Sequence, residues 1–199
     1  MKKINKRKIV IATMNDHKVS EIKALIGQEY NVLTQLDFSI PSVPETGRTF
    51  EENALIKAKK VANDTSLLTI ADDSGLEVDV LDGSPGIYSA RFAGSNATDE
   101  KNNAKLIDQI EKYIDQEIKA RFHSVIALID PGSSKQKVFH GIWEGRIITK
   151  PKGKNGFGYD PLFYIDELGC TAAELSHKEK NKISHRAKAM TDLMKYLLP

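Results

Sequence analysis

The segment 71–76 (ADDSGL) carries two adjacent carboxylates, Asp72 and Asp73, directly after the apolar run Leu67 to Ala71. Carboxylates at a strand end commonly hold Mg²⁺, which prefers oxygen ligands, keeps several waters and binds together with substrate phosphates. Asp, Ser and Gly are also ordinary turn residues, so the segment taken alone favours a plain turn. If the strand continues through the pair, the two side chains point to opposite faces and are not equivalent.

A second polar segment, 13–18 (TMNDHK), follows the apolar residues 9–12 and precedes a helical pattern. A strand, turn and helix in this order present backbone N–H groups and a helix dipole to an anion, and Thr13, Asn15 and Lys18 add donors. The P-loop pattern of glycines followed by Lys and Ser or Thr is missing. A triphosphate-binding turn and an ordinary strand-to-helix turn both remain open.

Glycines surround two aromatic residues, Phe157 and Tyr159, in the segment 151–161 (PKGKNGFGYDP). Glycines let the backbone approach a ligand, and an aromatic face can stack on a base. The segment superficially resembles an RNA-recognition strand, but Asp160 and Pro161 stand where that strand needs an apolar residue and a backbone donor. A Gly-rich hairpin turn remains the alternative to a base-binding loop.

Cations gather near the start of the last predicted helix: Lys178, Lys180, Lys182, His185 and Arg186. The helix macrodipole disfavours cations at a helix start, so we expect them to face an anion or a base carbonyl. Ser184 as the N-cap would fix His185 and Arg186 where they can bind a purine O6. The alternative is a solvated Lys-rich loop.

A further carboxylate, Glu45, lies in the segment 44–47 (PETG), and Glu51 and Glu52 begin the next predicted helix. One of these acids is a candidate to complete a metal shell with the Asp pair. The other histidines lack zinc-site spacing, and the single Cys170 excludes an internal disulfide and a cysteine metal cluster.

Alternating strand and helix patterns predict an α/β fold. Strands are expected at 8–13, 67–71, 122–129 and 138–143, with a hairpin turn at 131–132. Thr49 and Glu52 predict a capping box before a helix whose inward face carries Phe50, Ala54, Ala58, Val61 and Ala62. A helix at 99–118, capped by Thr98, should bury Leu106, Ile107, Ile110 and Ile114. A last helix should bury Met190, Leu193, Met194 and Leu197.

The bulk composition is that of an ordinary globular protein of 199 residues, 40% hydrophobic and 28% charged, with a net charge of +2. Such a chain forms one large domain or two small lobes. The balanced charge gives no field that attracts nucleic acid or an acidic membrane. The apolar residues 9–12 are too few for a membrane span or a signal-peptide core, so we expect a cytoplasmic protein with neither partner.

Taken together, the motifs resemble the inosine triphosphate pyrophosphatase family. The matching segments are 12–21 (ATMNDHKVSE), 45–54 (ETGRTFEENA), 71–76 (ADDSGL), 85–91 (PGIYSAR), 156–161 (GFGYDP) and 183–186 (ISHR). The resemblance extends from about Ile9 to Leu197. It implies that residues 1–199 form a single domain of two interleaved lobes.

The resemblance also implies a fold and an activity. The fold is an elongated α/β fold with a long, twisted mixed sheet flanked by helices, a nucleotide cleft between the lobes, and a homodimer. The activity is that of a nucleotide-metabolising hydrolase, in which Mg²⁺-dependent cleavage converts ITP, dITP and XTP to the monophosphate and pyrophosphate. That reaction keeps deaminated purines out of DNA and RNA.

Residue roles carry over by motif match. Asp73 corresponds to the catalytic base, and Asp73 and Glu45 to the metal site. The substrate-binding positions are Thr13, Met14, Asn15, Asp16, His17, Lys18, Ser74, Phe157, Gly158, Tyr159, Asp160, Lys180, His185 and Arg186. Alternatives are a pyrophosphatase for a modified pyrimidine nucleotide, and a nucleotide-binding or RNA-binding module without turnover. Mn²⁺ is an alternative metal.

Overall fold

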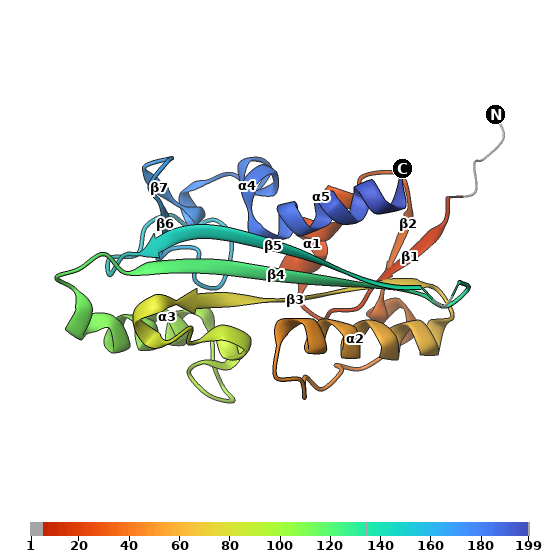
Figure 1. Ribbon diagram of the computed structural model, residues 1–199, viewed down its shortest axis with the longest axis horizontal. Coiled ribbons are helices and arrows are strands. Elements are labelled where there is room, and N and C mark those ends of the chain that lie inside the picture. The colour runs from red at the N-terminus through yellow and green to blue at the C-terminus, as the bar shows by residue number, and fades with distance from the viewer. Residues whose placement is uncertain (1–5, 134, 199) are drawn as a thin grey trace. The chain divides into compact units, whose positions relative to one another are not determined.

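The computed structural model describes residues 6–133 and 135–198, which form a sheet flanked by helices (Figure 1). Among these residues the sheet has seven strands in the order β2-β1-β3-β4-β5-β6-β7. The strands are β1 (Lys8–Ile11), β2 (Asn31–Thr34), β3 (Leu68–Val78), β4 (Lys119–Asp130), β5 (Lys135–Ile147), β6 (Phe163–Ile165) and β7 (Cys170–Thr171). The helices are α1 (Asp16–Ile26), α2 (Phe50–Thr65), α3 (Asp99–Ile110), α4 (His177–Ile183) and α5 (His185–Leu197).

The sheet is mixed, because β1 pairs in parallel with both β2 and β3, whereas β6 pairs antiparallel with β5 and β7. Parallel neighbours require crossover connections, and α1 and α2 supply them. The predicted α/β class and mixed sheet are therefore confirmed.

The chain divides into two compact units, each built from separate segments. The first comprises residues 1–73, 125–140 and 189–199. Its core joins α1 and the end of α5 to the strands through Ile9, Ile11, Ile22, Ile126 and Leu193. In this unit α2 covers the opposite face of the sheet (Figure 1) and buries the predicted positions Ala54, Ala58, Val61 and Ala62 completely.

The second unit comprises residues 74–124 and 141–188. Its core is more aromatic and includes Leu76, Leu106, Phe122, Trp143 and Phe163. The ring centroids of Phe122 and Phe163 lie 4.6 Å apart. Helix α3 packs into this core through its own apolar face.

The prediction that the Asp pair lies in a turn after the strand is wrong. Strand β3 continues through it to Val78, and Leu76 and Val78 beyond the pair are fully buried. Asp is unfavourable in strands on average, but tertiary packing overrides this preference where each carboxylate finds a partner.

Two helix predictions also need correction. Helix α3 ends at Ile110 and continues only as a short 3-10 turn, which leaves Ile114 58% exposed instead of buried. Lys180 and Lys182 belong to the separate helix α4, in whose last turn the macrodipole favours cations. Of the predicted cations, only His185 and Arg186 stand at the start of the last helix.

Three predicted caps are present, although one is incomplete. Thr98 caps α3, and the Ser184 hydroxyl accepts the Ala187 N–H at the start of α5. Thr49 caps α2 through the Glu52 N–H, as expected. The Glu52 carboxylate, however, accepts the N–H of Arg48 and not that of Thr49, so the predicted capping box is only half formed.

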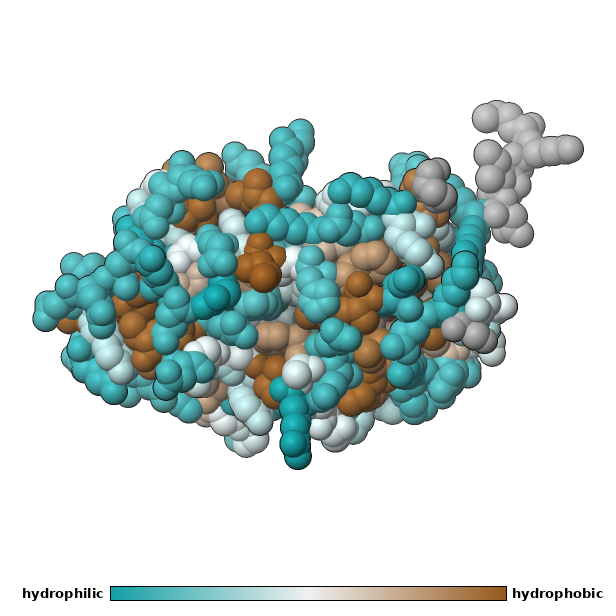
Figure 2. Space-filling model, in the orientation of Figure 1, coloured by the Kyte–Doolittle hydropathy of each residue, from teal (hydrophilic) through white to brown (hydrophobic). Residues whose placement is uncertain are grey.

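The surface is predominantly polar. On the face drawn in Figure 2, apolar residues form separate patches among hydrophilic ones. Within the described residues, no helix is both long enough and apolar enough to cross a bilayer.

The corrected end of α3 makes a prediction. Ile110 is completely buried and Ile114 is 58% exposed. Ile110→Ala should lower the free energy of unfolding by about 2 to 5 kcal/mol, because it leaves a cavity. Ile114→Ala should change it by less than about 0.5 kcal/mol. Urea unfolding of both variants measures this, and equal losses would mean that the helix continues as the sequence predicts.

Candidate active site

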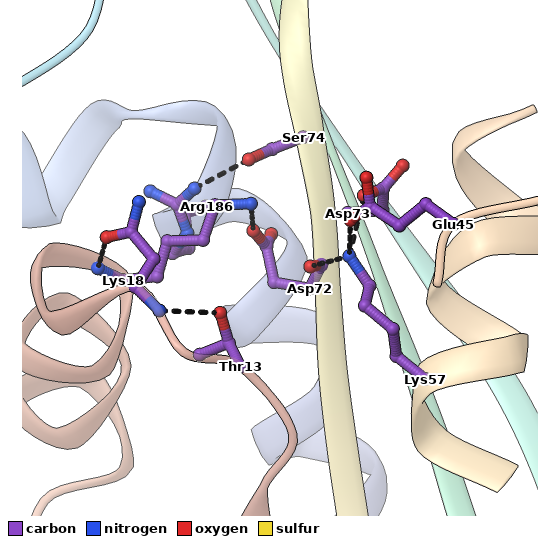
Figure 3. A network of polar contacts seen from close by, with 9 residues as sticks. Thr13, Lys18, Glu45, Lys57, Asp72, Asp73, Ser74 and Arg186 are labelled. Carbon is purple, nitrogen blue, oxygen red and sulfur yellow. Dashed lines mark hydrogen bonds and ion pairs between the residues drawn. The ribbon is translucent and has the colours of Figure 1, made fainter. Parts of the chain in front are cut away.

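The two adjacent carboxylates of β3 point to opposite sides of the strand (Figure 3). Asp72 is fully buried, and its Oδ2 lies 2.8 Å from Nζ of Lys18 in α1. Asp73 is 5% exposed, and its Oδ1 lies 2.7 Å from Nζ of Lys57 in α2. The two carboxylates therefore differ in surroundings, as expected for neighbours on an extended strand.

Lys57 connects Glu45 to the Asp pair of β3 through hydrogen bonds. Its Nζ donates to Glu45 Oε1 at 2.7 Å, to Asp73 Oδ1 at 2.7 Å and to the Asp72 carbonyl at 3.0 Å. These bonds use all three ammonium donors. Sequence reasoning missed Lys57, although a signal was present, because it interrupts the apolar face of α2 between Ala54 and Val61. A lysine on a buried face requires a partner.

The segment that carries Glu45 is fastened to the start of α2. The Gly47 N–H donates to Asn53 Oδ1 at 2.8 Å, and the Arg48 N–H donates to Glu52 Oε2 at 2.6 Å. A Cβ at Gly47 would lie 2.6 Å from Cβ of Glu52, so only glycine fits this close approach. Helix α2 thus positions both Glu45 and Lys57. The carboxylate of Glu52, which was also a candidate metal ligand, accepts the backbone N–H of Arg48.

The ionisation of this cluster follows from burial and charge. Burial raises the pKa of Asp73 above that of an ordinary carboxyl group, against the opposing effect of Lys57 and Lys18. Burial also lowers the pKa of Lys57, but the charges of Asp73 and Glu45 outweigh it and leave that pKa raised. Lys57 is therefore a cation at neutral pH, and Asp73 is more basic than an exposed carboxylate.

The turn 13–18 has the predicted strand-turn-helix form. Asn15 is the N-cap of α1, with its Oδ1 accepting the Lys18 N–H at 3.1 Å. The Thr13 hydroxyl accepts the Asn15 N–H at 3.2 Å. The turn therefore brings Thr13 and Lys18 toward Asp72 (Figure 3), whereas Met14, Asp16 and His17 are exposed.

The other predicted residues form a cluster inside the second unit. Arg186 is 1% exposed, and its Nη2 donates to Ser74 Oγ at 2.8 Å. Lys180 is 3% exposed and pairs with Asp160. Both cations lie by the ring of Phe157, with Lys180 Nζ 4.9 Å and Arg186 Cζ 5.8 Å from its centroid.

His185 is buried and stacked on aromatic residues. Its ring is 4.8 Å from that of Phe122, at an interplanar angle of 17°. The stacking fixes the imidazole at the start of α5, beside Arg186.

The Gly-rich segment 156–160 consists of bends and turns and not of a strand. Asp160 closes it, because its Oδ2 accepts the Phe157 N–H at 3.0 Å. Gly156 has a φ of +74°, and a Cβ there would collide with the Asp160 carboxylate. Asp160 therefore shapes the loop and also pairs with Lys180.

The donor set fits a metal that arrives with its substrate. Glu45 and Asp73 direct oxygens at one cationic centre, now the Lys57 ammonium. In the described residues, no group of three or more His, Cys, Asp or Glu side chains is arranged to hold an ion. Mg²⁺ commonly uses one or two carboxylates, with phosphate oxygens and water completing its shell, and the pair satisfies that requirement.

A cavity of about 750 Å³ lies in the second unit. Its lining includes Arg121, Trp143, Leu168 and Lys188, and of the cations predicted to face an anion or a base carbonyl it includes only Lys182. Apart from Met14, Asp16 and His17, which are exposed, the predicted residues gather into a carboxylate and lysine cluster in the first unit and an aromatic and cationic cluster in the second. Asp73 and Ser74, consecutive in β3, link the two covalently.

Relatives of known name match almost the whole chain. The dITP/XTP pyrophosphatase of Vibrio cholerae is 48% identical over 191 residues, covering 95% of this chain and 96% of its own. The dITP/XTP pyrophosphatase of Geobacter sulfurreducens is 49% identical over 192 residues, covering 96% of each chain.

Solved structures agree with the fold. A HAM1 protein from Coxiella burnetii superposes with a TM-score of 0.88 at 44% identity, covering 96% of this chain and 98% of its own. The Ham1 protein of Staphylococcus aureus gives a TM-score of 0.86 at 43% identity, with the same coverage. The model of the Ham1 family matches residues 9–196. This chain, whose motifs already indicated nucleotide pyrophosphatases, belongs to the Ham1 family.

Proposed function

We propose that this protein hydrolyses ITP, dITP and XTP to the nucleoside monophosphate and pyrophosphate. The names of its relatives support this substrate class. The observation that carries the chemistry is the buried Asp73 carboxylate, placed with Glu45 around one cationic centre. The proposed role is to remove deaminated purine nucleotides before they are incorporated into DNA and RNA.

The phosphates and the base are proposed to bind different clusters. The turn 13–18, with Lys18, takes the triphosphate, since a helix start offers backbone donors to anions. In the second unit Phe157 stacks on the base, while Lys180, His185 and Arg186 face its oxygens and Ser74, Gly158, Tyr159 and Asp160 complete the contacts. Donors that pair with a 6-oxo group are left unpaired when adenine enters, which discriminates by about 10⁴.

The chemical step is assigned to Asp73. Its raised pKa suits a general base that orients a water and accepts its proton as the water attacks the α-phosphorus. Pyrophosphate then leaves. Mg²⁺ bound at Asp73 and Glu45 would supply charge neutralisation for the triphosphate. Asp72 serves differently, because its ion pair holds Lys18 in position.

Further properties are proposed from the family resemblance. The chain 1–199 acts as one functional domain of two interleaved lobes, as a homodimer, in the cytoplasm. Neither nucleic acid nor membrane is a partner, which agrees with the net charge of +2.

The reaction is tested by its products. Purified protein is incubated with ITP, XTP, ATP, GTP and dUTP, with and without Mg²⁺, and the nucleotides are separated by chromatography. We expect monophosphate from ITP and XTP only when metal is present, with ATP and GTP largely spared. Preference for dUTP would favour a pyrophosphatase that acts on pyrimidine nucleotides. Binding of nucleotide without turnover would favour a nucleotide-binding module.

The unequal roles of the two Asp residues give a second test. Asp73→Asn should lower kcat for ITP by about 10² to 10⁴, the usual contribution of a general base. Asp72→Asn replaces the ion pair to Lys18 by a contact with a neutral amide, so it should mainly raise KM. Steady-state kinetics measures both, and thermal melting controls for folding. Turnover retained by Asp73→Asn but lost in Asp72→Asn would reverse the assignment.

A further inference from the structure

Both backbone groups of Gly158 are bound by side chains of α3. Asp99 Oδ2 accepts the Gly158 N–H at 2.6 Å, and Asn103 Nδ2 donates to the Gly158 carbonyl at 3.0 Å. Asp99 and Asn103 are four residues apart, which places them on one face of the helix. One helix therefore holds both sides of a single loop residue.

The loop is also fixed on each side of Gly158. Before it, the Phe157 N–H is bound by the Asp160 carboxylate. After it, the buried Tyr159 hydroxyl donates to the Ser89 carbonyl at 2.9 Å. Gly158 itself has a φ of +63°, a conformation that glycine adopts without strain. Phe157 is thus carried by a backbone with few remaining degrees of freedom.

Helix α3 is a firm support for such contacts. Leu106 and Ile110 are fully buried in the core of the second unit. Asn102 also binds the preceding segment, with its Oδ1 accepting the Ala93 N–H at 2.8 Å. Side chains on a packed helix hold a geometry more precisely than side chains on a loop.

We propose that Asp99 and Asn103 are positioning residues that hold the Phe157 ring in the orientation needed to stack on the substrate base. The proposal rests on the proposed function, because it assigns the base to Phe157. A loop ordered before binding spares the substrate the entropy of ordering it. Removing either side chain should therefore weaken nucleotide binding and raise KM, while the phosphate cluster and kcat stay unchanged.

The test compares Asp99→Ala and Asn103→Ala with Glu100→Ala. Glu100 is the matched control because it is also an acid in the first turn of α3. Its carboxylate is hydrogen-bonded to Thr98 and not to the loop that carries Gly158. Asp99→Asn retains an oxygen acceptor and should behave nearly as the unaltered protein. Melting temperatures show whether each variant is folded.

Three measurements separate positioning from general damage. Amide hydrogen exchange of Gly158, followed by NMR without nucleotide, should accelerate at least about tenfold in Asp99→Ala, because the bond to its N–H is lost. IMP affinity and the KM for ITP should each worsen about tenfold in both alanine variants, which equals about 1.4 kcal/mol. Inhibition by inorganic triphosphate, which has no base, should stay constant.

The opposite results are equally definite. Faster exchange at Gly158 with unchanged IMP affinity and KM would overturn the positioning role, as would unchanged exchange. Equal loss of inorganic triphosphate inhibition would show a general structural effect and also overturn it. Failure of the unaltered protein to hydrolyse ITP would instead contradict the proposed function, and the exchange data would still report on the contact between α3 and the loop.

Discussion

Lys18 and Lys57 allow β3 to carry two buried carboxylates, Asp72 and Asp73, at consecutive positions. A buried charge is costly unless it is paired and hydrogen-bonded, and removing one partner of a buried pair typically costs about 3 to 5 kcal/mol. Lys18 meets Asp72 from one side of the strand, and Lys57 meets Asp73 from the other (Figure 3). Because these lysines belong to α1 and α2, the ion pairs also fix both helices against the sheet of the first unit. The need to pair two buried carboxylates thus determines both the carboxylate site and the packing of α1 and α2 on the sheet.

The second unit uses a related arrangement. Buried Asp160 pairs with Lys180 and accepts the Phe157 N–H, so an ion pair again shapes a loop, here the one that carries Phe157, the residue proposed to stack on the base. In each unit a carboxylate positions a backbone segment or a cation through contacts with other groups of the protein. Electrostatic preorganisation of this kind lowers the reorganisation required during reaction. It also explains why so many predicted site residues are buried: their polar atoms are already bonded to one another.

Local signals in the sequence predicted the parts of the fold that local physics determines. The turn after β1, the Thr49 cap and the buried face of α2 follow from capping chemistry and helical spacing. Signals that depend on tertiary partners failed. Strand β3 runs through Asp72 and Asp73 only because lysines from distant helices meet them. The sequence shows Lys57 on the apolar face of α2 but not its partners Glu45 and Asp73, and Asp99 meets Gly158 across 59 residues of sequence. The family motifs indicated the proposed site residues but gave no information on which residues hold them in place.

The role proposed for Asp73 depends on attack of water at the α-phosphorus of a bound nucleoside triphosphate. Hydrolysis of ITP in ¹⁸O-labelled water, with mass analysis of both products, tests it directly. Attack at the α-phosphorus places one labelled oxygen in the monophosphate and leaves pyrophosphate unlabelled, which is the predicted result. Label in pyrophosphate with unlabelled monophosphate would show attack at the β-phosphorus and contradict the assignment.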